Sequence, residues 1–411
     1  MPSAPYTGGK FSRHLIDGSA TMTDTFSRRP APRATRTATG RTHNGPPRDN
    51  DCGTHGGVDT RADTRADAPA NGPWRMPPEW HPHAAGWMAW PGHTVLSGAR
   101  RAEVVDELGR IAHAIARFEP LHVAVDPAHL DEALRLLPAN ATLHPMPVDD
   151  HWMRDTGPTF VVDETASLHA VRWNFNSWGR KLRPMPAADP LVAERVALTL
   201  GVNASAAPIV AEGGSLLVDG EGTLIVTETS ILNPNRNPGL TRREAETLFR
   251  HWLGATHVVW LPGSWLDTIT DGHVDGVASF VRPGVLLATG ADGDDEWSRE
   301  ARENLRALLL ARDARGRHFD IGLLRSPDFD ALPADVANDA DFAPEYVNFY
   351  LPNGGVVMAA FGDPATDAQA REIVQRAFPE RRIVQLPLRA IARRGGGVHC
   401  CTQQQPATAA R

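Results

Sequence analysis

The sequence predicts an α/β protein built from five repeated units of two strands, a helix and a third strand, arranged radially around a central site. The same order of strand and helix signals recurs along the chain with a spacing of roughly 50 to 75 residues, which is typical of radial repetition. Glycine-rich or proline-containing turns join the strand pairs. One polar or reactive residue, or a pair, falls at the same place in every unit: Asp155, Glu212, His273 with Asp275, Asn348 and Cys400.

The first unit begins with a helix, because apolar residues recur at helical spacing over residues 104–115. The alternation and short length of residues 121–125 predict a strand. An amphipathic helix at 128–137 follows, and after a polar loop the chain forms strands at 159–162 and 167–175. This part of the chain therefore combines helices with a single strand and a hairpin.

The later units repeat this order. Helices are expected at 190–200, 242–253, 300–311 and 368–377, and the strands that follow the last three of them at 258–261, 319–323 and 382–386. Hairpins are expected at 216–227 and around turns at 282–284 and 353–355.

The last unit lacks a full hairpin, whereas an unassigned strand is expected near the start, at residues 86–90. Pairing of this strand with the last unit would close a ring that leaves no free sheet edge. The five reactive positions would then converge on one central cavity.

Composition limits the domain organisation and the classes of partner. Residues 1–72 hold ten basic and seven acidic residues with few apolar ones, so we expect a disordered extension, followed by one catalytic domain over 73–411. The net charge is −7 without a basic patch, which argues against a nucleic-acid partner. No apolar run approaches the ~20 residues of a membrane span. A secretory apolar segment is also missing, so the sequence predicts a cytoplasmic protein; a homo-oligomer is compatible with it.

Cys400 is the candidate nucleophile. It follows three glycines, a valine and a histidine, and the glycines would let the backbone pass close to a ligand. A buried structural cysteine is the commoner fate of a lone cysteine, but the polar cluster favours a reactive thiol here. If the stretch is extended, Cys401 faces the opposite way and packs, and Cys52 is incidental.

The remaining candidates are a histidine and three carboxylates. His273 and Asp275 would share one face of a strand, and a histidine can serve as general acid and then base. Asp155 could instead cap a turn, Asp275 could be a surface partner of His273, and Glu212 could be a turn residue rather than the group that orients His273.

Together these residues favour a planar cation as substrate. Paired carboxylates can each bind a guanidinium in bidentate fashion, which also polarises its central carbon for attack by sulfur. The alternative is a zinc site made of His273, Asp275, His399 and Cys400, although the chain lacks a His-x-x-x-His or Cys-x-x-Cys anchor.

Several ordered motifs resemble the agmatine deiminase family, which belongs to the guanidino-group-modifying enzymes of the pentein fold. They cover nearly everything after residue 75: MPPEWHPH at 76–83, WMAWP at 87–91, WMRDTGPTF at 152–160, EGGS at 212–215, NRNP at 235–238, TDGHVD at 270–275, YVNFY at 346–350 and HCCTQQQP at 399–406.

The resemblance implies a five-bladed α/β-propeller of ββαβ-type units. It implies hydrolysis of agmatine to N-carbamoylputrescine and ammonia, a step of polyamine metabolism, with no metal and no organic cofactor. Cys400 matches the nucleophile, His273 the general acid and base, and Glu212 the acid that orients it. Asp155 and Asp275 match the carboxylates that grip the guanidinium. We assign Trp152 and Asn348 to substrate binding as well.

Three short stretches depart from the family pattern. The chain has Gly397-Val398 where Asn-Ile is frequent, Gly276-Val277-Ala278 where Asn-Phe-Ala is common, and the basic run 180–183 in place of a neutral loop. Basic residues near the far end of the substrate would disfavour an ammonium and favour a carboxylate. Deimination of arginine or peptidyl-arginine therefore stays open as an alternative to agmatine. Two further alternatives are amidino transfer to an amine and a non-catalytic binding propeller.

Overall fold

The computed structural model describes residues 74–182 and 185–408. The extension expected at residues 1–72 lies outside the described residues. The strands of the described residues pair into five sheets. The order of strands and helices follows the predicted repeat. None of the described helices combines the length and the apolar character needed to cross a lipid bilayer.

Three sheets repeat one topology without variation. In each, the first two strands form an antiparallel hairpin, and a crossover helix then brings the third strand in parallel to the second. They are β4 (Thr159–Val162), β5 (Leu168–Arg172), α5 (Val192–Leu200) and β6 (Asn203–Ala206); β7 (Leu217–Val218), β8 (Thr223–Thr227), α7 (Arg242–Leu253) and β9 (His257–Leu261); and β10 (Ala278–Arg282), β11 (Val285–Gly290), α8 (Glu296–Leu310) and β12 (Asp320–Arg325).

The fourth unit is reduced. Strands β13 (Gly355–Ala360) and β14 (Arg382–Pro387) pair in parallel across helix α10 (Pro364–Ala377). A single antiparallel bridge between Tyr350 and Val357 stands where the other sheets have a first strand. The unit therefore keeps the two-strand, helix, strand order with its first strand shortened to one residue pair.

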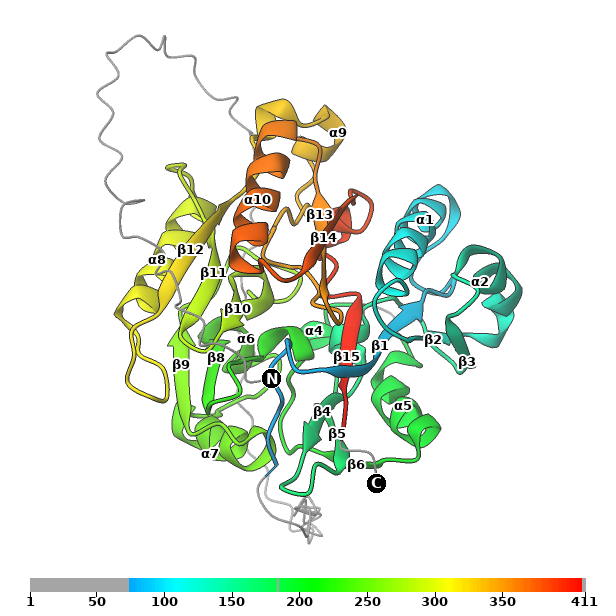
Figure 1. The fold of residues 1–411 in the computed structure, drawn as a ribbon, viewed down its shortest axis with the longest axis horizontal. Coiled ribbons are helices and arrows are strands. Elements are labelled where there is room, and N and C mark those ends of the chain that lie inside the picture. Colours follow the sequence, from blue (N-terminus) through cyan, green and yellow to red (C-terminus); the bar gives the residue numbers. More distant parts are fainter. Residues whose placement is uncertain (1–73, 183–184, 409–411) are drawn as a thin grey trace, which may run out of the picture. The chain divides into compact units, whose positions relative to one another are not determined.

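The remaining sheet contains both ends of the described chain. Its order is β15-β1-β2-β3, with β15 antiparallel and β2 parallel to β1, and Figure 1 shows β15 beside β1. Its elements are β1 (His83–Trp90), α1 (Gly98–Ile115), β2 (Leu121–Val125), η2 (Pro127–His129), α2 (Leu130–Leu136), β3 (Thr142–Pro145) and β15 (Thr402–Pro406). The expected pairing of the first strand with the last unit is confirmed.

Short helices fill the connections. They are α3 (Met153–Thr156), α4 (Ser177–Arg180), η3 (Asp189–Leu191), η4 (Gly213–Ser215), α6 (Glu228–Ile231), η5 (Val274–Gly276), η6 (Phe329–Ala331), α9 (Ala334–Ala337) and η7 (Ala392–Arg394). Three of them, α3, η4 and η5, immediately precede the first strands of the three regular sheets.

The apolar core lies between neighbouring sheets. One buried cluster packs Trp87 of β1 against Phe160 of β4 and Val196 of α5. Two further clusters join the β4-β5-β6 sheet to the β7-β8-β9 sheet, and the β7-β8-β9 sheet to the β10-β11-β12 sheet, in the same way. Burying each such side chain stabilises the fold by roughly 1.5–3 kcal/mol. Because the apolar residues are used between sheets, and α5 and α7 lie outward of their sheets (Figure 1), the polar residues are left to the inner ends of the strands.

Candidate active site

Six buried polar residues lie at equivalent places in the five units. Each lies on the segment immediately before the first strand, or the bridge that replaces it, of its sheet. None has more than 8% of its surface exposed. They are Asp155 on α3, Glu212 before η4, His273 and Asp275 at η5, Asn348 before the Tyr350 bridge, and Cys400 before β15.

Gly214 marks the point where these side chains meet. A Cβ atom at Gly214 would lie 2.7 Å from Nδ1 of His273, 2.9 Å from Oδ2 of Asp275 and 3.0 Å from Oδ1 of Asp155. The three side chains therefore face one small space that exists because residue 214 has no side chain.

Gly214→Ala is expected to reduce kcat/KM by at least tenfold, because its methyl group would push apart the groups that face this space. A displacement of about 1 Å in such a site can cost roughly 10²-fold in rate. Gly109→Ala within helix α1 is a suitable stability control, since a Cβ at Gly109 meets only the carbonyl oxygen of Leu136, at an ordinary 3.5 Å. Normal turnover by Gly214→Ala would contradict the close approach.

Cys400 lies against two polar groups of the cluster. The side-chain amide of Asn348 donates to Sγ from 3.2 Å, and Oδ2 of Asp275 is 3.5 Å from the same sulfur. Burial, together with the negative charges of Asp275 and Asp155, raises the pKa of the Cys400 thiol well above its ordinary value. The thiol is therefore protonated at neutral pH until the carboxylate charges are compensated.

The backbone around the two cysteines is a turn and not the extended stretch considered from the sequence. The prediction that the two side chains point in opposite directions along an extended strand is therefore wrong. Cys401 is nevertheless completely buried, and its amide donates to the carbonyl of Val398 within the turn. Cys400 alone of the two contacts Asn348 and Asp275.

Asp155 does not cap its own turn. Its Oδ1 accepts from the amide of Gly214 at 3.0 Å and its Oδ2 from Nε1 of Trp178 at 2.9 Å. Burial raises the pKa of Asp155, partly offset by His273 and reinforced by Asp275. Nδ1 of His273 lies 3.9 Å from Oδ1 of Asp155, but its charge does not offset burial and the two adjacent carboxylates.

Asp275 has a different environment. Its Oδ2 accepts from Nδ1 of His399 at 2.8 Å. Burial favours the neutral acid, but the hydrogen bond and charge of His399 outweigh it and lower the pKa of Asp275. Asp275 is therefore ionised, and it faces the space at Gly214 together with Asp155. Two carboxylates on either side of one point can hold a planar cation by its N–H groups.

His273 is oriented by Glu212. Nε2 of His273 lies 3.1 Å from Oε2 of Glu212, which also accepts from Nε of Arg236 at 3.0 Å. Although burial opposes it, the negative charges of Asp155 and Glu212 raise the pKa of His273 to about 9. A charged imidazole held in this way can donate a proton to a leaving group.

The sequence predicts that His273 and Asp275 lie on a strand, but in the structure they do not. His273 precedes η5 and Asp275 lies within it. The tight 3₁₀ turn, rather than strand alternation, brings both side chains to the space at Gly214. Glu212 precedes η4 and also bonds His273, so its two interpretations are both correct.

The raised pKa of His273 predicts a loss of stability at high pH. Its ordinary value is 6.5 and its value in the fold is about 9, so this contribution is complete below pH 6.5 and disappears as the pH rises through about 9. The size is about 3 kcal/mol by linkage. Urea unfolding of wild type and His273→Gln at pH 6 and pH 9.5 would measure it. A loss between the two pH values that is equal in both proteins would contradict the assignment.

A buried charge network behind the site was not assigned from the sequence. Both ring nitrogens of His399 face carboxylates, Asp275 at 2.8 Å and Glu79 at 2.5 Å. Ionised carboxylates only accept hydrogen bonds, so His399 carries both protons and a positive charge. Arg154 lies 3.5 Å beyond Glu79. Glu79, Arg154 and His399 all lie within the sequence motifs, and that is the only signal for them in the sequence. Their pairing depends on contacts between segments that are far apart in the chain.

Trp152 lies close to Cys400. A Cβ at Gly396 would be 2.6 Å from Cζ3 of Trp152 and 3.1 Å from Sγ of Cys400. Arg394 lies over the indole ring, with its guanidinium carbon 6.0 Å from the ring centre. Because residue 396 has no side chain, its backbone can pass close to both the indole and the sulfur. The closeness to a ligand that the sequence predicts for this glycine run stays a prediction.

The arrangement gives no support to a zinc site. Within residues 74–182 and 185–408, no group of three or more His, Cys, Asp or Glu side chains is placed to hold a metal ion. Both nitrogens of His399 and one nitrogen of His273 are occupied by carboxylates, which explains this result.

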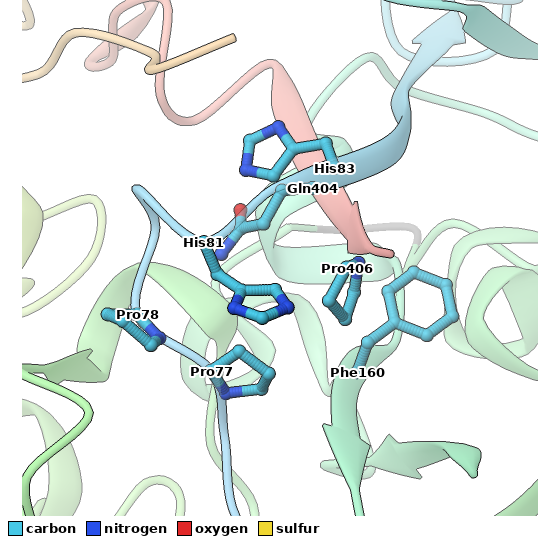
Figure 2. A pocket seen from close by; sticks show the side chains of 7 residues that line it. All are labelled: Pro77, Pro78, His81, His83, Phe160, Gln404 and Pro406. Atoms are coloured by element: carbon cyan, nitrogen blue, oxygen red, sulfur yellow. The ribbon is translucent and has the colours of Figure 1, made fainter. Parts of the chain in front are cut away.

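Figure 2 shows a separate pocket. It is lined by Pro77, Pro78, His81, His83, Phe160, Gln404 and Pro406. None of the six cluster residues contributes to it, although Gln404 accepts from Arg154 at 2.7 Å. The pocket is therefore a neighbour of the charge network and not part of the cluster around Cys400.

Known proteins resemble the chain over this whole region. The family model of the Porphyromonas-type peptidyl-arginine deiminases matches residues 75–406. Agmatine deiminase from Pseudomonas aeruginosa (strain LESB58) is 39% identical over 354 residues, covering 81% of this chain and 95% of that protein. The agmatine deiminase from Ectopseudomonas mendocina (strain ymp) is 40% identical over 353 residues, with the same coverage.

The structure of the agmatine deiminase of Enterococcus faecalis superposes with a TM-score of 0.75 at 30% identity, covering 81% of this chain and 96% of that one. The five sheets thus have the pentein fold, as the sequence predicted. The chain belongs to the Porphyromonas-type peptidyl-arginine deiminase family, with agmatine deiminases among its relatives.

Proposed function

We propose that the protein hydrolyses agmatine to N-carbamoylputrescine and ammonia through a covalent intermediate on Cys400. The relatives named agmatine deiminase support a guanidine deiminase acting on carbon–nitrogen bonds. The observation that carries the mechanism is the space at Gly214, which two carboxylates and a charged histidine face and against which Cys400 lies 3.5 Å from Asp275.

Substrate binding prepares the nucleophile. The guanidinium would lie between Asp155 and Asp275 and compensate the negative charges that raise the pKa of Cys400. The thiol then loses its proton to solvent more easily, so the attacking thiolate forms when the substrate is in place and His273 keeps the proton that it later donates. The bound carboxylates also polarise the guanidinium carbon toward the sulfur.

The reaction then proceeds in two halves. The Cys400 thiolate forms a bond to the guanidinium carbon, and His273 donates its proton to the departing amino group, which leaves as ammonia. In the second half His273 takes a proton from water, whose oxygen bonds to the same carbon of the thiouronium. The carbon–sulfur bond breaks, releasing the urea product and the thiolate. Glu212 holds His273 in position for both transfers.

Other features of the proposal follow from the same site. An amidinotransferase would use the same first half with an amine in place of water, and no contact in the described residues favours an amine acceptor. Residues 73–411 would act as one catalytic domain, with the extension at 1–72 dispensable. A cytoplasmic location and a homo-oligomeric state stay predictions.

The test is ammonia release from purified protein with agmatine, arginine, a peptidyl-arginine and a guanidino acid, each with and without a chelator. We expect turnover of agmatine, a urea product, and no effect of the chelator. Turnover that requires a metal, or none of any guanidine, would refute the proposal.

A further inference from the structure

Glu345 lies one turn from the residues that face the reacting carbon. The carbonyl of Glu345 accepts from the amide of Asn348 at 3.1 Å. Asn348 in turn donates to the sulfur of Cys400 at 3.2 Å. An alkyl chain leading away from a guanidinium held at Asp155 and Asp275 therefore has this turn within its reach.

The side chain of Glu345 points toward Gly276. Its Cγ lies 3.8 Å from the position that a Cβ of Gly276 would occupy, and Gly276 directly follows Asp275. Position 276 is also where the chain departs from the residues common in agmatine enzymes. A larger residue there would compete with Glu345 for space, so the small residue and the acid fit together.

The Glu345 carboxylate has no positive partner. Among the described residues, none donates a hydrogen bond from its side chain to this carboxylate and none forms an ion pair with it, whereas Asp155, Glu212 and Asp275 all have such partners. The residue is partly exposed, so a ligand can reach it. Burying an unpaired carboxylate is unfavourable, and the charges of Asp267 and Asp275 add to burial in raising the pKa of Glu345 to about 8.

The basic run 180–183, which was expected to attract a carboxylate tail, does not oppose a cation near Glu345. Nζ of Lys181 is 2.7 Å from Asp271 and donates to the carbonyl of Ile269 at 3.0 Å. Its charge is therefore already compensated within the protein. Arg180 is exposed, and Arg183 lies outside the described residues.

We propose that Glu345 binds the ammonium at the far end of the substrate and thereby selects linear guanidines with a cationic tail. This inference rests on the proposed deiminase function. The acid would pair with the tail ammonium as Asp155 and Asp275 pair with the guanidinium, so both charged ends of agmatine would be held. A free or peptidyl arginine would instead bring its carboxylate or amide close to Glu345.

The test compares agmatine with N-butylguanidine, which keeps the guanidinium and the alkyl chain but lacks the ammonium. At pH 9, where Glu345 is ionised, Glu345→Gln should reduce kcat/KM for agmatine by roughly tenfold to a hundredfold, the range of a lost charge-assisted hydrogen bond, mainly through KM. The value for N-butylguanidine should stay unchanged. Glu345→Asp, which keeps the charge, should restore part of the agmatine activity, and Glu303→Gln on the exposed face of α8 provides a matched charge control.

A pH series adds a second readout. In wild type the ratio of kcat/KM for agmatine to that for N-butylguanidine should rise as the pH increases from 6.5 to 9, because Glu345 ionises near pH 8 while His273 affects both substrates alike. In Glu345→Gln the ratio should be flat. Asp267 and Asp275 are the charged groups that act on Glu345, and Asp275 stays ionised over this range because the hydrogen bond and charge of His399 lower its pKa.

The outcomes separate the two proposals. Equal losses on both substrates, or no loss on either, would overturn the role of Glu345 while leaving the deiminase function intact. Turnover of neither substrate by wild type would overturn the deiminase function, and with it this inference.

Discussion

Cys400→Ser is expected to abolish turnover, with a loss of ~10³-fold or more in kcat, whereas Cys401→Ser should keep most of it. A hydroxyl is a far weaker nucleophile than a thiolate at this site, and Cys400 alone of the two cysteines contacts Asn348 and Asp275. Cys401 is fully buried within the turn, so its replacement should affect stability more than rate.

The measurement is steady-state ammonia release for both variants, with mass spectrometry of wild-type protein trapped during turnover. The covalent adduct should be found on the peptide that carries Cys400 and should be missing from Cys400→Ser. Equal loss of activity in the two variants would indicate that the cysteines act as a structural pair, or that the other sulfur is the nucleophile.

Asp155→Asn and Asp275→Asn are each expected to reduce kcat/KM by about three orders of magnitude. An amide keeps the shape of the carboxylate but loses its charge and places N–H donors where the cation needs acceptors. Two charge-assisted contacts of roughly 1.5–3 kcal/mol each would be lost per variant. Part of the loss should appear in kcat, since the two carboxylates also orient the carbon for attack.

Stability must be measured beside the kinetics. In Asp155→Asn the new amide group would face either the Gly214 amide or the Trp178 indole, both of which donate to Asp155. Some loss of unfolding free energy is therefore expected. Trp178→Phe removes one of these donors but leaves the carboxylate, so it is the matched control and should keep much of the activity. Near-normal kcat/KM with lowered stability in the Asn variants would refute the guanidinium clamp.

The sequence predicts best those elements that have a clear apolar periodicity and are bounded by turn residues. Strand β2 at Leu121–Val125 and helix α7 at Arg242–Leu253 have the predicted bounds, because both have clear apolar spacing. Strands β3 and β6 were not predicted. Both are short, and most of their residues are exposed or only partly buried, so they carry little apolar pattern and depend on pairing with a neighbouring strand.

The site shows the same division. The positions of Asp155, Glu212, His273, Asp275, Asn348 and Cys400 at equivalent points of the repeat were visible in the sequence, and the structure brings them together. Their local conformations were not, since tight turns replace the strands assumed around His273 and Cys400. The partners of His399 and the isolation of Glu345 depend on residues far apart in the chain, which no local pattern reports.

The pairing of β1 with β15 has a consequence for synthesis on the ribosome. Strand β1 is made among the first described residues, yet one of its edges stays open until residues 402–406 have been added. Cys400 lies two residues before that strand. The nascent chain therefore acquires Cys400 and the strand that closes its first sheet in the same few steps of elongation. A chain released before residue 400 carries an unpaired edge and lacks Cys400, so under the proposed mechanism it could not modify guanidines.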